Sequence, residues 1–329
     1  MRVLITGGAG FIGSNLARHW VRSHENDEVV VFDALTYAGR RESLLDLATE
    51  RRFRFVEGDV RDPAALDQVV PGSDLVIHLA AESHNDRAVT DPLPFVDTNV
   101  RGTATLLEAC RRHDVGRLHH VSTDEVFGSL PLGTSEKFTT ETPYRPHGPY
   151  SASKAGADHL VRAWHDTYKL PVTISNCSNN YGPYQFPEKL IPLAITRILT
   201  GERVPLYGDG RNVRDWIFVE DHCDALDLIA RKGTSGATYL VSAGSELANI
   251  EVVRRILRIL GKSESSIEYV ADRPGHDLRY ALDAHALVAE LGWRPRHDFD
   301  SALERTVAWY RTHEAWWRPL LAPAVRTAA

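Results

Sequence analysis

The sequence has little that would place the protein in a membrane, in an oxidising compartment or on a nucleic acid. Its 329 residues include only three cysteines, Cys110, Cys177 and Cys223, which lack the spacing of metal ligands or of a disulfide framework. No apolar run is long enough to span a bilayer, and no charged-then-apolar leader precedes the strand-like residues 2–5. Acidic residues outnumber basic ones, 44 to 38, which argues against sequence-independent binding of nucleic acid. We therefore expect a cytoplasmic protein with reduced thiols, no metal site, no membrane contact and no nucleic-acid partner.

What the sequence does contain is a regular alternation of short apolar runs with helical patterns. Six runs are typical of buried strands: residues 3–6, 29–32, 53–56, 75–79, 118–121 and 172–175. The longest helical patterns between them cover about 94–112 and 150–168. This alternation predicts the α/β class, with a Rossmann-type doubly wound parallel sheet and right-handed crossovers.

The texture of the chain changes after residue 178. Prolines at 183, 187, 192 and 205 punctuate short elements, and basic residues are spaced through Lys189, Arg203, Arg211, Arg214 and Arg273. We expect residues 1–178, with some later segments, to form a dinucleotide-binding domain. Residues 179–329 would form mainly a smaller, substrate-binding domain over the carboxyl edge of the sheet. Its cationic side chains could clamp a substrate pyrophosphate, although a solvated surface is the alternative for each of them.

A glycine-rich turn, residues 7–13, follows the first strand and opens a helix. In that context Gly8 and Gly10 would let the backbone approach a pyrophosphate, and Gly13 would let the helix pack close to the strand. Asp33 ends the second strand, 20 residues after Gly13 (33 − 13). A carboxylate there accepts hydrogen bonds from the adenosine ribose and repels a 2′-phosphate, which favours NAD over NADP. An aspartate serving only the turn before residues 35–37 is the alternative.

Two short runs carry the candidate chemistry. Tyr150 and Lys154 are four residues apart, so at the start of a helix they share one face. A lysine beside a tyrosine would pull the phenol pKa from about 10 towards neutrality, and such a tyrosine can take a proton from an alcohol while hydride leaves. Asp124 and Glu125, at the carboxyl end of the fifth strand, add two acid/base groups. This combination favours a dehydrogenase that also eliminates water, although Tyr-x-x-x-Lys alone is common by chance.

Seven longer motifs extend these features over nearly the whole chain. They are GGAGFIG at 7–13, AAESH at 80–84, STDEVFG at 122–128, YSASK at 150–154, NNYGPYQFPEKLIPL at 179–193, YGDGRNVRDW at 207–216 and DRPGHDLRYALD at 272–283. Through them the sequence resembles the extended short-chain dehydrogenase/reductases, and within these the dTDP-glucose 4,6-dehydratases. The related sugar-nucleotide 4-epimerases lack both carboxylates at the positions of Asp124 and Glu125.

The resemblance implies an NAD-dependent hydro-lyase of deoxysugar metabolism that acts on a nucleotide-diphosphate sugar, dTDP-glucose, as a homodimer. Thr123, Tyr150 and Lys154 match the set that oxidises the sugar at C4. Asp124 matches the acid that protonates the departing C6 hydroxyl, and Glu125 matches the base that removes the C5 proton. With the glycine turn, the expected cofactor contacts are Gly7, Gly10, Phe11, Ile12, Gly13, Asp33, Ala34, Leu35, Thr36, Asp59, Val60, Ala80, Ala81, Glu82, Ser83, His84, Thr98, Tyr150, Lys154 and Asn180. The expected substrate contacts are His84, Thr123, Asp124, Glu125, Asn179, Lys189, Leu190, Pro205, Leu206, Tyr207, Arg214, Asn249, Asp272, Arg273, Pro274, Gly275 and His276.

The sequence departs from the family pattern at a few positions. A valine and a serine are usual where this chain has Asn85 and Ala88, an asparagine where it has Arg40, and a tyrosine where it has Phe127. None of these changes removes a predicted catalytic group. The alternatives are a 4,6-dehydratase or 4-epimerase for another nucleotide sugar such as UDP-glucose, and a non-catalytic dinucleotide-sensing regulator. The sequence also leaves open whether the product enters cell-wall sugars or natural products such as antibiotics.

Overall fold

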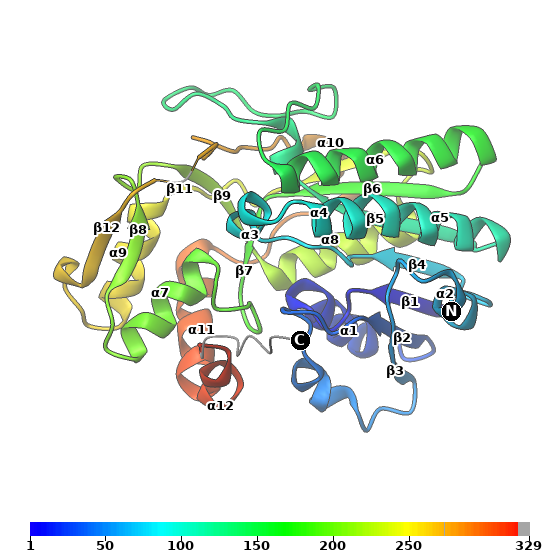
Figure 1. Cartoon of the computed structure of the whole chain (residues 1–329), viewed down its shortest axis with the longest axis horizontal. Helices are drawn as coiled ribbons and strands as arrows, with labels where there is room; N and C mark the ends of the chain where they lie inside the picture. Colours follow the sequence, from blue (N-terminus) through cyan, green and yellow to red (C-terminus); the bar gives the residue numbers. More distant parts are fainter. Residues whose placement is uncertain (273, 322–329) are drawn as a thin grey trace.

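A parallel sheet with the strand order β10-β6-β5-β4-β1-β2-β3 forms the centre of the molecule (Figure 1). The computed structural model describes residues 1–272 and 274–321. Its strands are β1 (Arg2–Thr6), β2 (Glu28–Asp33), β3 (Phe53–Glu57), β4 (Leu75–His78), β5 (Arg117–Thr123), β6 (Val172–Cys177) and β10 (Thr238–Val241). The six predicted strands are confirmed. The seventh, β10, comes from the C-terminal half and extends the sheet beside β6.

Side chains that alternate along each strand give the sheet two apolar faces, as expected when helices cover both sides. On one face Val3 and Ile5 pack with residues of α1 (Phe11–Ser23), η1 (Arg41–Leu47) and α8 (Val219–Lys232). On the other face Leu4 and Val30 pack with α2 (Pro63–Val69), α5 (Thr103–Arg112) and α6 (Pro149–Tyr168). The predicted doubly wound α/β fold is therefore confirmed.

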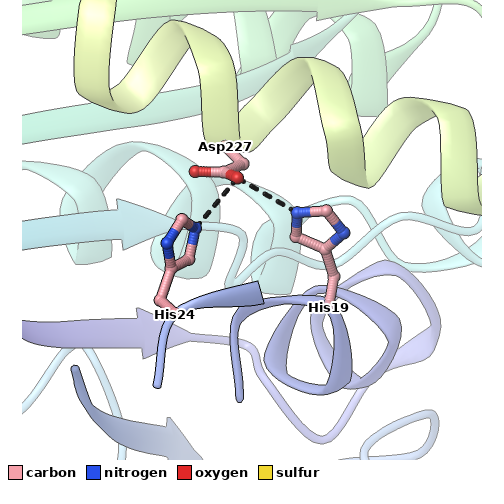
Figure 2. A group of neighbouring side chains, drawn as sticks. All are labelled: His19, His24 and Asp227. Carbon is pink, nitrogen blue, oxygen red and sulfur yellow. Dashed lines mark hydrogen bonds and ion pairs between the residues drawn. The ribbon is translucent and has the colours of Figure 1, made fainter. Parts of the chain in front are cut away.

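A polar group joins α1 to α8 on the first of these faces (Figure 2). The Nε2 atoms of His19 and His24 lie 3.1 Å and 3.0 Å from Asp227 Oδ2, and Arg231 Nε lies 2.6 Å from Asp227 Oδ1. His19, His24 and Asp227 present potential metal-ligand atoms within 4.8 Å of one another. The sequence analysis did not predict this grouping. Because the guanidinium of Arg231 already balances the Asp227 carboxylate, we interpret the group as an ion-pair network that holds the two helices together.

The segment after β4 contains the helix predicted over 94–112, which runs without a break from residue 93 to 112 and has a π-helical middle part. It comprises α3 (Asn85–Thr90), α4 (Leu93–Phe95), a π-helical segment η2 (Val96–Gly102) and α5. Within η2, the buried Asn99 side chain bonds the backbone N–H and C=O of Glu82 at 2.9 Å each, and Ser153 Oγ at 2.8 Å. The wide π turn thus fixes the strand-end residues 80–84 against α6, which is typical of π-helices near functional sites.

The smaller part of the molecule lies beyond the carboxyl ends of the parallel strands, at the left of Figure 1. It contains β11 (Glu246–Ala248), β9 (Val213–Phe218) and β7 (Asn179–Tyr181) in one sheet, and β12 (Ile267–Val270) with β8 (Val204–Tyr207) in another. Its core includes α7 (Leu190–Leu199), α9 (Asn249–Ile259), α11 (Phe299–Thr312) and α12 (Glu314–Trp317). The remaining short helices are η3 (Asp124–Phe127), η4 (Glu264–Ser266), α10 (His285–Leu291) and η5 (Arg318–Leu321). Within residues 1–272 and 274–321, no helix is both long and apolar enough to cross a bilayer.

Candidate active site

A single pocket at the carboxyl ends of β1, β2, β4 and β5 gathers most of the predicted site residues. All of the predicted catalytic residues line it: Thr123, Asp124, Glu125, Tyr150 and Lys154. The predicted cofactor and substrate residues that also line it are Gly7, Gly10, Phe11, Ile12, Gly13, Asp33, Ala34, Thr36, Asp59, Val60, Ala80, Ala81, Glu82, Ser83, Thr98, Asn179, Asn180 and Lys189. Segments far apart in the sequence therefore meet where open α/β sheets bind their ligands.

Other predicted residues lie outside this pocket. Leu35 packs against the sheet core with a φ of 50°, and His84 caps α3. The predicted substrate residues that do not line the pocket are Leu190, Pro205, Leu206, Tyr207, Arg214, Asn249, Asp272, Pro274, Gly275 and His276. Arg273 lies outside the described residues. Tyr207, Asp272 and His276 lie together, since His276 Nδ1 is 2.6 Å from Asp272 Oδ1 and the rings of Tyr207 and His276 are 6.1 Å apart. Arg214 is buried and donates to the carbonyl oxygens of Val213 and Asp277.

The pocket also has lining residues that the sequence analysis did not assign to the site. They are Phe32, Tyr37, Ala38, Gly39, Gly58, Arg61, Leu79, Val121, Ser122, Cys177, Ser178, Gln185, Phe186 and Glu188. Most adjoin a predicted residue. Gln185, Phe186 and Glu188 belong to the 179–193 motif, which was a usable signal. Tyr37 follows the predicted Thr36, and its ring packs under Arg87, whose guanidinium carbon lies 3.9 Å from the ring centre and whose Nε lies 3.5 Å from Glu188 Oε2.

The glycines of the first turn serve different purposes. A Cβ on Gly13 would lie 2.3 Å from the Gly7 carbonyl oxygen, so helix and strand approach closely there, as predicted. A Cβ on Gly8 would lie 2.6 Å from Val31 Cγ1. Gly8 therefore permits packing on β2, and its approach to a pyrophosphate stays a prediction. A Cβ on Gly10 would meet only the Gly7 oxygen, at 3.3 Å, and Gly10 lines the pocket. Gly10 is the glycine that leaves room for a ligand.

Asp33 holds the end of β2 to the glycine turn. Its Oδ2 accepts a hydrogen bond from the Ala9 N–H at 2.9 Å, and its Oδ1 accepts one from the Leu35 N–H at 2.8 Å. Burial raises the pKa of the Asp33 carboxyl, and these N–H donors act in the opposite direction. Asp33 thus makes the turn contacts that were its alternative role. A carboxylate has about four lone-pair sites, so two remain for a ribose at the pocket wall.

Tyr150 and Lys154 lie one turn apart on one face, because α6 begins at Pro149 as predicted. The Lys154 ammonium donates to the Val121 carbonyl at 2.8 Å. Burial, followed by the nearby Glu125 carboxylate, raises the pKa of Tyr150 well above its usual value, and a hydrogen bond with Thr123 acts in the opposite direction. The expectation that Lys154 draws this pKa towards neutrality is therefore wrong for the chain by itself.

Asp124 and Glu125 are consecutive but have unlike surroundings. Thr123 Oγ1 donates to Asp124 Oδ1 and accepts from the Glu125 N–H, each at 3.2 Å. Asp124 is buried, and its Oδ2 has no hydrogen-bond partner among the described residues. Burial, followed by the charge of Glu125, raises the pKa of Asp124 well above its usual value, which favours its protonated form. Glu125 Oε2 instead accepts a hydrogen bond from Asn85 Nδ2 at 3.0 Å.

The positions that depart from the family pattern are now placed. Asn85 contacts Glu125, and Ala88 is buried with Phe95 and Tyr150. Phe127 stacks on Phe138 at 5.1 Å between ring centres. Arg40 Nε lies 3.2 Å from Glu42 Oε2. Of these residues, Asn85 bonds directly to a predicted catalytic group.

Comparison with known proteins agrees with this geometry. The model of the family described as GDP-mannose 4,6 dehydratase matches residues 4–306. A dTDP-glucose 4,6-dehydratase of Mycobacterium tuberculosis is 56% identical over 321 residues, covering 97% of this chain and 96% of that one. One from Streptomyces niveus is 46% identical, covering 100% and 98%.

Solved structures of similar fold include dehydratases and epimerases that act on nucleotide sugars. The dTDP-glucose 4,6-dehydratase of Streptomyces venezuelae, with NAD and dTDP bound, has a TM-score of 0.95 and 49% identity, and the match covers 97% of this chain and 100% of that one. A UDP-glucose 4-epimerase from Thermus thermophilus in complex with NAD has a TM-score of 0.86 and 32% identity, covering 95% and 100%. The predicted resemblance and the predicted Rossmann-type fold are confirmed.

Proposed function

This chain belongs to the GDP-mannose 4,6-dehydratase family, and from that premise we propose that it is a dTDP-glucose 4,6-dehydratase. It converts dTDP-glucose to dTDP-4-keto-6-deoxyglucose and water. The observation that carries this proposal is the pair of carboxyls, Asp124 and Glu125, in the same pocket as Tyr150. A 4-epimerase needs a base for one hydroxyl, whereas removal of water needs a further acid and a further base.

The cofactor is NAD, and the pocket fits it at its adenosine end and at its phosphates. Gly10 leaves backbone open at the start of α1, where N–H groups and the helix dipole favour a pyrophosphate. The Asp33 carboxylate retains acceptor sites for a ribose, and its negative charge would repel a 2′-phosphate. When bound, NAD takes up a hydride from C4 of the sugar and returns it to C6 within the same turnover.

The residues then have the following proposed roles. Tyr150, with Thr123 and Lys154 beside it, takes the proton of the 4-hydroxyl as C4 becomes a ketone. The ketone acidifies the hydrogen on C5, which would otherwise be too weak an acid for a carboxylate. Glu125 removes that proton, and Asp124 gives its own proton to the C6 oxygen, so that water leaves and a C5–C6 double bond forms. A proton returned to C5 completes the product.

The nucleotide end of the substrate is proposed to extend towards the smaller part of the molecule. Lys189 and Asn179 line the pocket on that side, and Lys189 Nζ is 2.8 Å from the Ser83 carbonyl oxygen. Tyr207, Asn249 and His276 lie beyond it and are the proposed contacts for the base and the second phosphate.

A homodimer is proposed from the surface of the segment before α5. Leu93 and Val96 are 72% and 50% exposed there, on the same side of the sheet as α5 and α6. Apolar side chains grouped at the surface are typical of subunit contacts. Cys110, Cys177 and Cys223 are buried free thiols, which supports a reducing compartment such as the cytoplasm.

Turnover by the purified protein without added NAD tests the proposal. Incubation with dTDP-, UDP- and CDP-glucose should yield a 4-keto-6-deoxy sugar, fastest from dTDP-glucose, because the regenerated cofactor remains bound. Release of a 4-epimer would indicate a 4-epimerase instead. Absence of turnover with all three sugars, in protein that contains NAD, would favour a dinucleotide-sensing regulator.

A further inference from the structure

A hydrogen bond joins the ends of two neighbouring strands across the pocket. Asn85 is the first residue of α3, which follows the residues that leave β4, and Glu125 lies in the turn η3 directly after β5. The strands β4 and β5 pair in parallel from Leu75 and Arg117 to His78 and His120. Asn85 Nδ2 lies 3.0 Å from Glu125 Oε2 and 3.4 Å from Oε1.

We propose that Asn85 is a positioning residue that holds the Glu125 carboxylate where it can take the C5 proton. The inference rests on the proposed function and adds a specific requirement to it. Within residues 1–272 and 274–321, the hydrogen bonds to the Glu125 carboxylate come from Asn85 alone. A half-buried glutamate has three side-chain torsions to restrain, and a single donor near both oxygens restrains the last of them.

The chemistry of the amide suits a base rather than an acid. The Asn85 NH₂ group can only donate, and it cannot exchange its proton with the substrate at neutral pH. The NH₂ group therefore favours the ionised form of the Glu125 carboxyl. Each carboxylate oxygen has two lone pairs, so one remains to accept the C5 proton. Asp124, the adjacent carboxyl, has no such donor at its Oδ2. The structure thus gives the two carboxyls different surroundings before any substrate arrives.

The helix that carries Asn85 is itself anchored. Tyr207 OH donates to the Asp86 carboxylate at 3.0 Å, which connects α3 to β8 in the smaller part of the molecule. The His84 side chain accepts from the Arg87 N–H at 3.4 Å and caps the first turn. Because the Tyr207 hydrogen bond and the His84 cap both hold α3 in place, Asn85 can restrain the Glu125 side chain.

Single-turnover kinetics with dTDP-glucose in deuterated water test this role. In Asn85→Leu, which keeps the size and removes the donor, nicotinamide absorbance should rise at the wild-type rate, because oxidation at C4 depends on Tyr150. The later fall of absorbance and the uptake of deuterium at C5 should slow about tenfold, the effect of one lost bond to a charged group, with KM unchanged. Asn85→Asp places a like charge beside Glu125 and should slow that phase further, whereas Asn85→Ser, which keeps a donor, should restore part of the rate.

The control is Asp91→Ala at the opposite, exposed end of the same helix, which should leave both phases unchanged. Equal slowing of both phases in Asn85→Leu would mean a general disturbance of the pocket and would overturn the positioning role. Wild-type rates in both phases would overturn it as well. Failure of the wild-type protein to form the 4-keto-6-deoxy sugar would refute the proposed function. This outcome is read from the wild type alone and does not depend on the variants.

Discussion

Lys154 donates a hydrogen bond from its ammonium group to the backbone carbonyl of Val121, 2.8 Å away. The bond ties α6 to β5 at the floor of the pocket, one turn from Tyr150. Burial lowers the pKa of Lys154, and the nearby carboxylate of Asp158 acts in the opposite direction. The lysine is therefore both a tether for the helix and the buried cation closest in sequence to the reacting tyrosine.

Lys154→Met should abolish most of the oxidation at C4. The ammonium is a buried positive charge one helical turn from Tyr150, and such a charge favours the phenolate that takes the proton. The rise in nicotinamide absorbance in a single turnover should slow by about 100-fold or more, the usual contribution of a general base. Lys169→Met, at the exposed end of the same helix, is the matched control. A normal rise in Lys154→Met would contradict the role given to Lys154.

Asp124→Asn should separate oxidation from elimination. The amide cannot give a proton to the C6 oxygen, so the reduced cofactor should accumulate while dehydration slows by about 100-fold or more. Burial raises the pKa of Asp124 well above its usual value, so its acid form persists to a higher pH than in an exposed aspartate. The elimination phase should therefore decline as the pH rises through that pKa. Stopped-flow profiles would show this alkaline decline in the wild type and not in Asp124→Asn; an unchanged profile in the variant would exclude Asp124 as the acid.

Gly10→Ala and Gly13→Ala should fail in different ways. A Cβ at position 10 has nearly enough room within the protein but projects into the pocket, so NAD affinity should fall with little loss of stability. A Cβ at position 13 overlaps the Gly7 carbonyl, and overpacking of this kind costs about 1–3 kcal/mol. Isothermal titration with NAD and thermal unfolding would measure the two effects. Equal losses of stability in both variants would refute the distinction.

Asp227→Asn should reduce stability in a pH-dependent way. Burial alone would raise the pKa of Asp227, but hydrogen bonds from His19, His24 and Arg231 outweigh it and lower the pKa to about 2. A folded-state pKa below the unfolded value of about 3.9 contributes stability above about pH 4, which is lost as the pH falls towards 2. Because the Asp227 side chain is only 10% exposed, this contribution is about 2 kcal/mol.

Urea unfolding of the wild type and of Asp227→Asn, compared from neutral to acid pH, measures that contribution. The difference in unfolding free energy should be about 2 kcal/mol at neutral pH and should shrink towards zero near pH 2. Asp97→Asn removes an exposed partner of Arg101 at 3.8 Å and should change stability by less than about 0.5 kcal/mol at any pH. A constant difference across the range would show that the Asp227 network does not act through its charge.

The sequence predicted those parts of the site that depend on local pattern. The strands, the glycine turn and the spacing of Tyr150 and Lys154 each follow from neighbouring residues, and the structure contains them. The sequence could not predict the direction of the Tyr150 pKa shift, because the burial and the acidic neighbours that cause it come from segments that only folding brings together. The packing requirement at Gly8 could not be predicted for the same reason, since it comes from Val31 on the adjacent strand. Asn85 was visible only as a departure, and its meaning required the position of Glu125.

The predicted helix over 94–112 is present, but the sequence did not show that its middle part is a π-helix. Its apolar spacing fits an α-helix, but Asn99 bonds the backbone of Glu82 and Gly102 packs close to Val60, and the chain widens into a π turn between them. Such tertiary contacts override local preference.

Deuterium incorporation by Glu125→Gln tests the central claim most directly, namely that the nicotinamide chemistry is coupled to loss of water through a carboxylate base. In deuterated water, the wild type should convert dTDP-glucose to a 4-keto-6-deoxy sugar with deuterium at C5. Glu125→Gln should oxidise the sugar, retain the reduced cofactor and form almost no dehydrated product. A Glu125→Gln protein that releases the normal product with deuterium at C5, at the wild-type rate, would contradict the account.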